Sequence, residues 1–364
     1  MPEARPVGYA DRAGILARFG LFGVSLLLFL LLLEAGLRVV QVAPSNLMFD
    51  ALTNQMHQVH LDTFAALVRN DPELFWVLAP HQTLPEDSPK LRGLISNGAG
   101  LREERDIPFA KPAGQFRVLF VGDSCTFGFG VTHRETFVEG VERRLRARFP
   151  ERDIACINAG VPGYTLAQGW AYLRREGLRY QPDIVLCAFG WNDQRRWSSF
   201  DDLTRMEQAR RATPPGLLRW SEVCRQAWSL SVQWKHPETS NKVARVSAPT
   251  FARLLDGMHE LCANKGAHFI PMVWPVEANV KKADAGWTAY QKATALFQPP
   301  PPRAEPSVID LLPAIERALM DGWTVRDLFM DGVHPTARAH DYIAERIADA
   351  LAPLLADARP VTLP

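Results

Sequence analysis

The sequence predicts an α/β domain built on a parallel sheet and preceded by one membrane-spanning helix. Residues 118–121 form an apolar run with no polar alternation, which is typical of a strand buried on both faces. From residue 116 onward, such runs alternate with segments of helical periodicity, and this pattern predicts a parallel sheet with helices on both faces and right-handed crossovers. Residues 19–33 are uncharged and rich in leucine, as a membrane-spanning helix requires.

The N-terminal apolar segment predicts a single transmembrane helix over residues 19–40. Glu34 and Arg38 interrupt the apolar character, but their i,i+4 spacing lets them pair on one helix face near the membrane surface. A cleaved signal peptide is the alternative. The small-x-small cleavage site that it needs is poorly formed, because Pro44 directly follows Val42-Ala43.

The residues before this helix predict its orientation. Residues 1–18 form a polar tail that carries Arg5, Arg12 and Arg18. Positive charge of this kind favours a cytoplasmic N-terminus. The bulk of the chain is then expected on the extracytoplasmic side, in a periplasm or an extracellular space.

Composition limits the partners and cofactors that the chain is expected to have. The 364 residues are 47% hydrophobic and 22% charged, and the net charge of +1 predicts no nucleic-acid partner. The five cysteines are scattered and odd in number, so no disulfide framework is expected, and inert buried thiols are the ordinary interpretation. The sequence has no zinc-like Cys/His spacing and no Walker-type phosphate loop, so it predicts no metal and no cofactor.

The chain beyond the apolar helix divides into an arm, a large domain and a short tail. Residues 42–111 are mixed and contain prolines, which predicts an extended arm packed on the domain, with a helix over 61–68 and a strand over 75–78. The domain is expected over residues 112–355, followed by a tail over 356–364. Its predicted strands are 116–121, 154–157, 183–189, 268–274 and 307–309. Its predicted helices are 136–149, 165–178, 249–265 and 335–355.

Two stretches of the domain depart from the regular alternation. Residues 195–247 are rich in arginine and tryptophan and contain Pro214-Pro215, which predicts a helical insertion over one edge of the sheet. The stretch between the last two predicted strands is expected to be a loop that ends in Pro299 to Pro302.

Ser124 is the candidate nucleophile. It follows the first predicted strand in Gly122-Asp123-Ser124, and open α/β sheets place their chemistry at the carboxyl ends of parallel strands. A serine hydroxyl needs a base to remove its proton, usually a histidine oriented by a carboxylate. Cys125 next to it is a thiol of interest if it is accessible, and an inert one if it is buried.

Asp331 and His334 are the candidate acid–base pair. They are three residues apart, on a turn just before the last predicted helix and after the last predicted strand. This spacing can return the carboxylate to the imidazole Nδ1. Alternatively, Asp331 is an ordinary turn residue and His334 an exposed loop histidine.

Acyl transfer also needs hydrogen-bond donors directed at the developing oxyanion. Gly163, after the second strand, would let a backbone N–H approach a ligand, and Asn192, after the third strand, offers a side-chain amide. The alternatives are a plain strand-to-helix turn for Gly163 and a helix-capping asparagine for Asn192.

Together these residues resemble the sequence blocks of the SGNH, or GDSL-type, hydrolase family. The resemblance covers about residues 112–200 and 248–355. The four blocks, in order, are Gly122-Asp123-Ser124, Asn158-x-Gly160-x-x-Gly163-x-Thr165, Gly190-x-Asn192-Asp193 and Asp331-x-x-His334-Pro335. Upstream, residues 96–102 look like the lead-in segment of the membrane-anchored bacterial branch. The departure is Cys125, where a larger apolar residue is more usual.

The resemblance implies a flavodoxin-like three-layer sandwich with about five parallel strands. It implies Ser124 as nucleophile, His334 as base and Asp331 as the residue that orients it. It also implies an oxyanion hole made by the N–H groups of Ser124 and Gly163 and by the Asn192 amide.

The expected function is that of a membrane-anchored serine ester hydrolase that forms an acyl-serine intermediate. The expected substrates are O-acyl, especially acetyl, esters of envelope or extracellular carbohydrate. One alternative is an O-acyltransferase that passes the acyl group to a cell-envelope glycan. Another is a non-catalytic, membrane-tethered binding protein on the same fold; a lipase is a weaker alternative, and the sequence is silent on oligomeric state.

Four residues near the third strand and in the insertion are candidate substrate contacts. Asp193 and Trp191 flank Asn192, and Arg195 and Arg245 offer positive charge for an anionic substrate. Tryptophan faces suit sugar rings, although buried packing is the more frequent role. Further tryptophans gather in the same region: Trp197, Trp220, Trp228 and Trp234.

Overall fold

The computed structural model describes residues 9–40, 47–58, 62–88, 91–281, 288–300 and 306–357. The chain divides into two compact units. The first consists of Met1–Asn46 and Glu207–Pro237, and the second of Leu47–Met206 and Glu238–Pro364. Most of the expected C-terminal tail and the first eight residues of the N-terminal tail lie outside the described residues.

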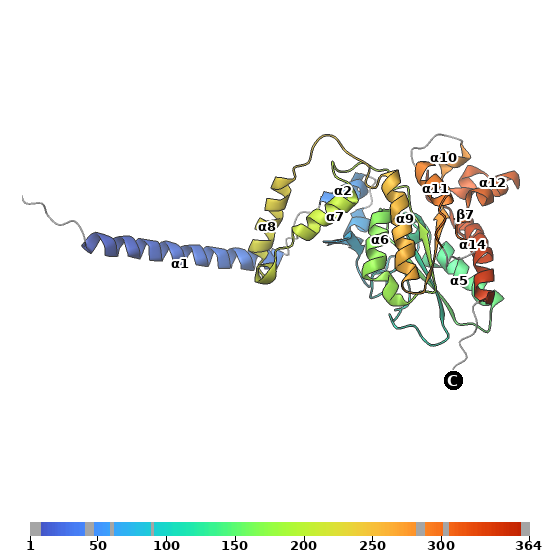
Figure 1. The fold of residues 1–364 in the computed structure, drawn as a ribbon, viewed down its shortest axis with the longest axis horizontal. Coiled ribbons are helices and arrows are strands. Elements are labelled where there is room, and N and C mark those ends of the chain that lie inside the picture. Colours follow the sequence, from blue (N-terminus) through green and yellow to red (C-terminus); the bar gives the residue numbers. More distant parts are fainter. Residues whose placement is uncertain are drawn as a thin grey trace, which may run out of the picture. The chain divides into compact units, whose positions relative to one another are not determined.

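Five parallel strands form the central sheet of the second unit, in the order β4-β3-β5-β6-β7 (Figure 1). They are β3 (Phe116–Gly122), β4 (Ile154–Gly160), β5 (Ile184–Ala188), β6 (His268–Val273) and β7 (Ile309–Asp310). This is the flavodoxin-like order, and it confirms the predicted fold class. All residues of β4 and β5 are buried, as the uninterrupted apolar runs predicted.

The register makes the three central strands end at the same level. Gly122 at the end of β3 is paired with Gly160 at the end of β4 and with Ala188 at the end of β5. Because the strands are parallel, the residues that follow them emerge at one edge of the sheet.

Helices cover both faces of this sheet (Figure 1). On one side lie α5 (Phe137–Arg148) and α14 (Ala337–Asp357), which pack on each other. On the other lie α6 (Leu166–Arg175) and α9 (Ala248–Ala263). Their apolar residues recur at helical spacing and are buried, so each helix is held by the face that it presents to the sheet.

Residues 47–111 pack apolar side chains into the core of the sheet domain. This segment contains α2 (Leu47–Gln58), α3 (Asp62–Leu67) and an antiparallel pair of strands, β1 (Val68–Asp71) and β2 (Phe75–Leu78). Leu52, Phe64 and Trp76 are fully buried in the same core cluster as the main strands.

The expectation of a loop between β6 and β7 is wrong. This stretch contains α10 (Glu277–Val280) and α11 (Thr288–Ala295), and the end of the expected loop lies partly outside the described residues. Tyr290 of α11 stacks edge-on against Phe251 of α9 and donates a hydrogen bond to the Val246 carbonyl, so tertiary packing fixes this helix. Two more helices, α12 (Leu312–Met320) and α13 (Val325–Leu328), come before the last turn.

The insertion is helical, as predicted, but part of it belongs to the other unit. It contains α7 (Asp202–Arg211), the 3₁₀ helix η3 (Gly216–Trp220) and α8 (Glu222–Lys235). Residues 207–237 form a compact unit with α1 (Tyr9–Val40), an arrangement that the expected insertion over one edge of the sheet did not include. Within α1, Gly14–Val40 is long and apolar enough to cross a membrane, with a mean hydropathy of 2.4 and no burial.

Candidate active site

Ser124 lies directly after β3, at the start of the one-turn helix α4 (Ser124–Phe127). Asp123 caps this helix, because its carboxylate accepts a hydrogen bond from the Cys125 N–H at 2.9 Å. Ser124 itself is partly exposed, whereas its neighbours Asp123 and Cys125 are buried. The strand-to-helix turn thus presents one hydroxyl at the carboxyl edge of the sheet.

His334 lies within hydrogen-bond distance of that hydroxyl. Its Nε2 is 2.8 Å from Ser124 Oγ, and its Nδ1 is 2.7 Å from Asp331 Oδ2. The turn holds the carboxylate in place, since Asp331 Oδ1 accepts the N–H groups of Val333 and His334 at 2.8 Å each. The Phe129 ring packs against the imidazole, with 4.7 Å between centroids.

The surroundings of Asp331 keep it ionised. Partial burial raises its pKa, but the hydrogen bond and charge of His334 and the two backbone N–H groups outweigh that and lower the pKa to about 2. A carboxylate on Nδ1 leaves Nε2 without its hydrogen in the neutral ring, so Nε2 can accept the serine proton.

The thiol beside the nucleophile is inert. Cys125 is 2% exposed, and burial raises the pKa of its thiol well above the usual range. Its Sγ faces the Val333 carbonyl at 3.7 Å. All five cysteines of the chain are free.

Gly163 occupies a position that excludes a side chain. Its φ is +81°, in the left-handed region, and a Cβ there would come within 2.9 Å of Leu52 and 3.0 Å of Trp76. Trp76 also donates its indole N–H to the Pro162 carbonyl at 3.0 Å. The loop after β4 is therefore shaped by β2, from a part of the chain almost ninety residues upstream.

Asn192 follows β5 and is 9% exposed. Its Nδ2 donates to the Tyr164 carbonyl at 3.1 Å and to Asp123 Oδ2 at 3.2 Å. Burial raises the pKa of Asp123 to about 6, although the Cys125 N–H and the nearby His334 oppose the shift. Asp123 thus links the nucleophile turn to the Asn192 amide, a role that sequence analysis did not assign to it.

Asp193 is a structural residue, which corrects its expected contact with substrate. It is 0% exposed and accepts the N–H groups of Gly190 and Leu166 at 3.0 Å each. Burial raises its pKa to about 8, against the opposing effects of the Leu166 N–H and Arg245. Its role is to join the loop after β5 to the start of α6.

Arg245 is also a structural residue, which corrects its expected contact with substrate, because it is only 1% exposed. Its guanidinium forms a buried ion pair with Asp202, with 2.9 Å between Nη2 and Oδ2. It also donates to the Gly163 carbonyl at 2.7 Å and to Gln168 Oε1 at 2.6 Å. Arg245 therefore holds the Gly163 loop and is inaccessible to substrate.

Trp191 and Arg195 remain the accessible candidates for substrate contact. Arg195 is exposed and lies over the half-buried Trp191 ring, at 5.4 Å from its centroid. Trp197 packs inward against Trp76 and Arg245. Trp220, Trp228 and Trp234 belong to the unit formed with α1.

One group of side chains in the described residues has the composition of a metal site. Potential ligand atoms of Glu103, His133 and Glu139 lie within 4.8 Å of one another. The first two residues are buried, His133 Nε2 is 3.3 Å from Glu139 Oε1, and Glu103 accepts the Asn158 N–H at 2.7 Å. None of the three belongs to the group around Ser124.

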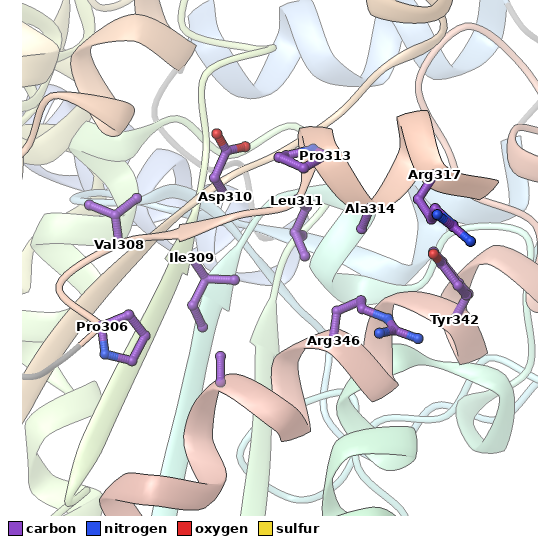
Figure 2. Close-up of a pocket in the computed structure, with 11 residues that line it drawn as sticks. Pro306, Val308, Ile309, Asp310, Leu311, Pro313, Ala314, Arg317, Tyr342 and Arg346 are labelled. Atoms are coloured by element: carbon purple, nitrogen blue, oxygen red, sulfur yellow. The ribbon is translucent and has the colours of Figure 1, made fainter. Parts of the chain in front are cut away.

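A pocket of about 410 Å³ lies between β7, α12 and α14 (Figure 2). Asp310, Arg317, Tyr342 and Arg346 supply its polar side chains. None of the residues discussed around Ser124 lines it. Arg317 is paired with Asp321, just after the end of α12, and Arg346 with Glu345 and Asp349 of α14, so both arginines of the pocket have acidic partners.

Comparison with known proteins identifies the family. The model of the GDSL-like lipase/acylhydrolase family matches residues 120–342, more than half of the chain. The chain belongs to this family, and it is an esterase. A search of the curated proteins gave no match.

Three solved structures are also similar to the chain. One is LAE5, an α/β hydrolase enzyme from the metagenome of Lake Arreo, Spain (19% identity, TM-score 0.45, covering 66% of this chain and 97% of that one). Another is Axe2, an acetylxylan esterase from Geobacillus stearothermophilus (18% identity, TM-score 0.43, 66% and 94%). The third is a two-domain esterase, CEX, active on acetylated mannans and co-crystallized with mannopentaose (17% identity, TM-score 0.42, 68% and 54%).

Proposed function

We propose that this chain is a membrane-anchored serine esterase of the SGNH type that removes acyl groups, chiefly acetyl, from carbohydrate outside the cytoplasm. The observation that carries the catalytic part is the chain of contacts from Ser124 Oγ through His334 to Asp331, at 2.8 Å and 2.7 Å. Nucleophile, base and orienting carboxylate in this geometry can perform acyl transfer.

In the proposed reaction, His334 Nε2 takes the proton of Ser124 as Oγ attacks the ester carbonyl carbon. The ionised Asp331 stabilises the imidazolium. The tetrahedral intermediate collapses, and the leaving alcohol takes the proton back from His334, which leaves an acyl-serine. A water molecule then attacks the acyl carbon while His334 removes its proton. The second tetrahedral intermediate collapses, Ser124 Oγ takes the proton back from His334, and the acyl group leaves as a carboxylic acid.

Three donors would stabilise the oxyanion. The N–H groups of Ser124 and Gly163 make no hydrogen bond within the part of the chain that the structure describes, so both are free to donate. Asn192 would supply the third donor, in exchange for its 3.2 Å contact with Asp123. Donors fixed before substrate arrives stabilise the transition state without reorganisation.

The location and the substrate class are supported by sequence and composition. The segment Gly14–Val40 has the length and hydropathy of a membrane span, and the arginines before it favour a cytoplasmic N-terminus. An enzyme domain on the far side would meet envelope carbohydrate. The Trp191 face beside Asn192 suits a sugar ring.

The test compares the full-length protein in detergent with Ser124→Ala and with Ser240→Ala, an exposed serine as matched control. We expect a fluorophosphonate probe to label wild type and Ser240→Ala but not Ser124→Ala, with p-nitrophenyl acetate hydrolysis following the same order. Labelling of Ser124→Ala equal to wild type would refute the assignment of the nucleophile.

A second arm of the test addresses the substrate. Acetylated oligosaccharide should release acetate, and a phospholipid should release no fatty acid. An added carbohydrate acceptor should remain unmodified by mass spectrometry. Acyl groups appearing on that acceptor would replace hydrolysis by transfer, through the same acyl-serine.

A further inference from the structure

Exposed apolar side chains outside α1 are concentrated in one short segment. Nine large hydrophobic side chains outside α1 are exposed in the described residues, and six of them lie between Leu217 and Trp234. They are Leu217, Leu218, Trp220, Trp228, Leu230 and Trp234. Leu217 is 85% exposed and Trp234 is 88% exposed, which is costly in water and indicates a missing apolar partner.

This segment is attached to the C-terminal part of α1 by partly buried hydrogen bonds to Glu34. Glu34 accepts hydrogen bonds from Ser221 Oγ at 2.9 Å, from the Glu222 N–H at 2.9 Å and from the Val223 N–H at 3.0 Å. It therefore caps α8 from a residue 187 positions away in the sequence. Arg38 pairs with Glu34 and also donates to the Trp220 carbonyl.

The Glu34 contact explains a charge that is otherwise out of place. Glu34 follows an uninterrupted leucine-rich run, where an uncompensated carboxylate is strongly unfavourable. Its two oxygens are satisfied by the first turn of α8 and by Arg38, one turn further along α1. The contact places η3 and α8 next to the end of the apolar helix, as Figure 1 shows within this unit.

The face of α8 is suited to lie in a membrane surface. Val223, Ala227, Leu230 and Trp234 are spaced i, i+4, i+7 and i+11, so they form one stripe along the helix. Fourteen residues are too few to span a bilayer, but they suffice for a helix lying in its interface. Tryptophan is the residue type enriched at that depth.

Charge indicates which surface this segment would meet. Residues 216–235 contain three basic side chains and one acidic one, giving a net charge of +2. The basic residues are Arg219, Arg225 and Lys235, and the acidic one is Glu222, which pairs with Arg225. Basic side chains bordering an apolar stripe are attracted to anionic lipid headgroups.

We propose that η3 and α8, residues 216–235, lie in the membrane interface beside the end of α1 and bind anionic phospholipid. The proposal rests on the membrane anchoring stated under the proposed function. Chain connectivity then gives three links between the membrane unit and the sheet domain: one after residue 46 and one on each side of residues 207–237. A chain held in the membrane by α1 alone would have one such link.

The test uses the full chain reconstituted in vesicles of phosphatidylcholine and phosphatidylglycerol, with a nitrobenzoxadiazole label on single introduced cysteines. Cys224 is replaced by serine because it is partly exposed and would also react with the label. The other four cysteines are buried and can stay. The positions are Leu217→Cys and Trp234→Cys in the segment, Leu27→Cys in α1, and Met320→Cys, a 73% exposed apolar residue of the sheet domain, as matched control.

We expect lipids with a spin label near the headgroup to quench about half of the emission at positions 217 and 234, and iodide in the water to quench position 320 alone. Position 27 should respond to lipids labelled deep in the acyl chain. Glu34→Ala should reduce lipid quenching at 217 and 234 and leave position 27 unchanged.

Three results would overturn the proposal. If iodide quenches positions 217 and 234 while lipid still quenches position 27, the interfacial placement of residues 216–235 is refuted and the membrane anchor stands. Protection of 217 and 234 from both lipid and iodide, with energy transfer between differently labelled copies, assigns the patch to a second copy of the chain. Loss of lipid quenching at position 27 as well refutes the membrane anchor and the proposal with it, while the activity of Ser124 would be untouched.

Discussion

Replacing Arg245 by methionine should destabilise the enzyme strongly, because it breaks a buried ion pair. Arg245 and Asp202 have side chains that are 1% and 0% exposed. The substitution keeps the length of the side chain but removes the guanidinium from the buried Asp202 carboxylate. Among the described residues, the Thr165 hydroxyl, at 2.7 Å, is then the remaining side chain that donates to this carboxylate. Burial already raises the pKa of Asp202, with Arg245 opposing that shift.

The size of the effect follows from the cost of an uncompensated buried charge. Removing one partner of a buried pair costs about 3–5 kcal/mol in the free energy of unfolding. For a domain of this size, that corresponds to a fall of about 6–20 °C in the melting temperature. Asp202→Asn combined with Arg245→Met removes both charges of this pair, so the double variant should recover about 1–3 kcal/mol of the loss.

A catalytic effect should accompany the loss of stability. Arg245 Nη1 holds the Gly163 carbonyl at 2.7 Å, and Gly163 is the proposed oxyanion donor after β4. Losing this contact should lower kcat by up to about 100-fold, with little change in KM, because the donor matters most in the transition state.

Tryptophan fluorescence during thermal unfolding, in detergent, measures the stability of wild type, both single variants and the double variant. Hydrolysis of p-nitrophenyl acetate below the melting temperature measures kcat and KM. An Arg245→Met protein with the same melting temperature as wild type would refute this assignment. So would a double variant whose loss of stability exceeds the sum of the losses in the two single variants.

The other predictions concern the groups around Ser124. Asn192→Ala should lower kcat by about 100-fold, and Asn264→Ala, an exposed asparagine, should leave it unchanged; equal rates in the two variants would exclude Asn192 from the oxyanion hole. Asp331→Asn should lower kcat by about 10⁴-fold. Because the folded pKa of Asp331, about 2, is below its ordinary value of 3.8, its stabilising contribution is complete above pH 3.8 and is lost as the pH falls through 2. Thermal unfolding of wild type and Asp331→Asn should therefore converge only in strong acid, and a difference independent of pH would contradict this assignment.

The sheet could be predicted from the sequence because each central strand is marked by apolar residues that are adjacent in the chain. A strand buried on both faces carries a run of consecutive apolar residues, so β3, β4 and β5 could be located without knowing their neighbours. Helices in the stretch between β6 and β7 were missed for the opposite reason. Their apolar residues are few, and contacts such as that of Tyr290 with Val246 fix them.

The proximity of Ser124, Asp331 and His334 could also be expected from the sequence, because parallel strands direct the residues that follow them to one edge. Substrate contacts could not be predicted in the same way. Asp193 and Arg245 are charged residues near the expected site, and nothing in their local sequence distinguishes a buried structural charge from an accessible one.

By itself, then, the sequence determined the parallel α/β fold, the apolar N-terminal helix and the placement of candidate catalytic groups at strand ends. These properties depend on hydrophobic periodicity and on residues close together in the chain. Tertiary structure alone decided that Trp76 shapes the Gly163 loop, that Arg245 supports it and that Glu34 caps α8. Each of these contacts joins residues more than eighty positions apart, and such pairs leave no periodic signal because only folding brings them together.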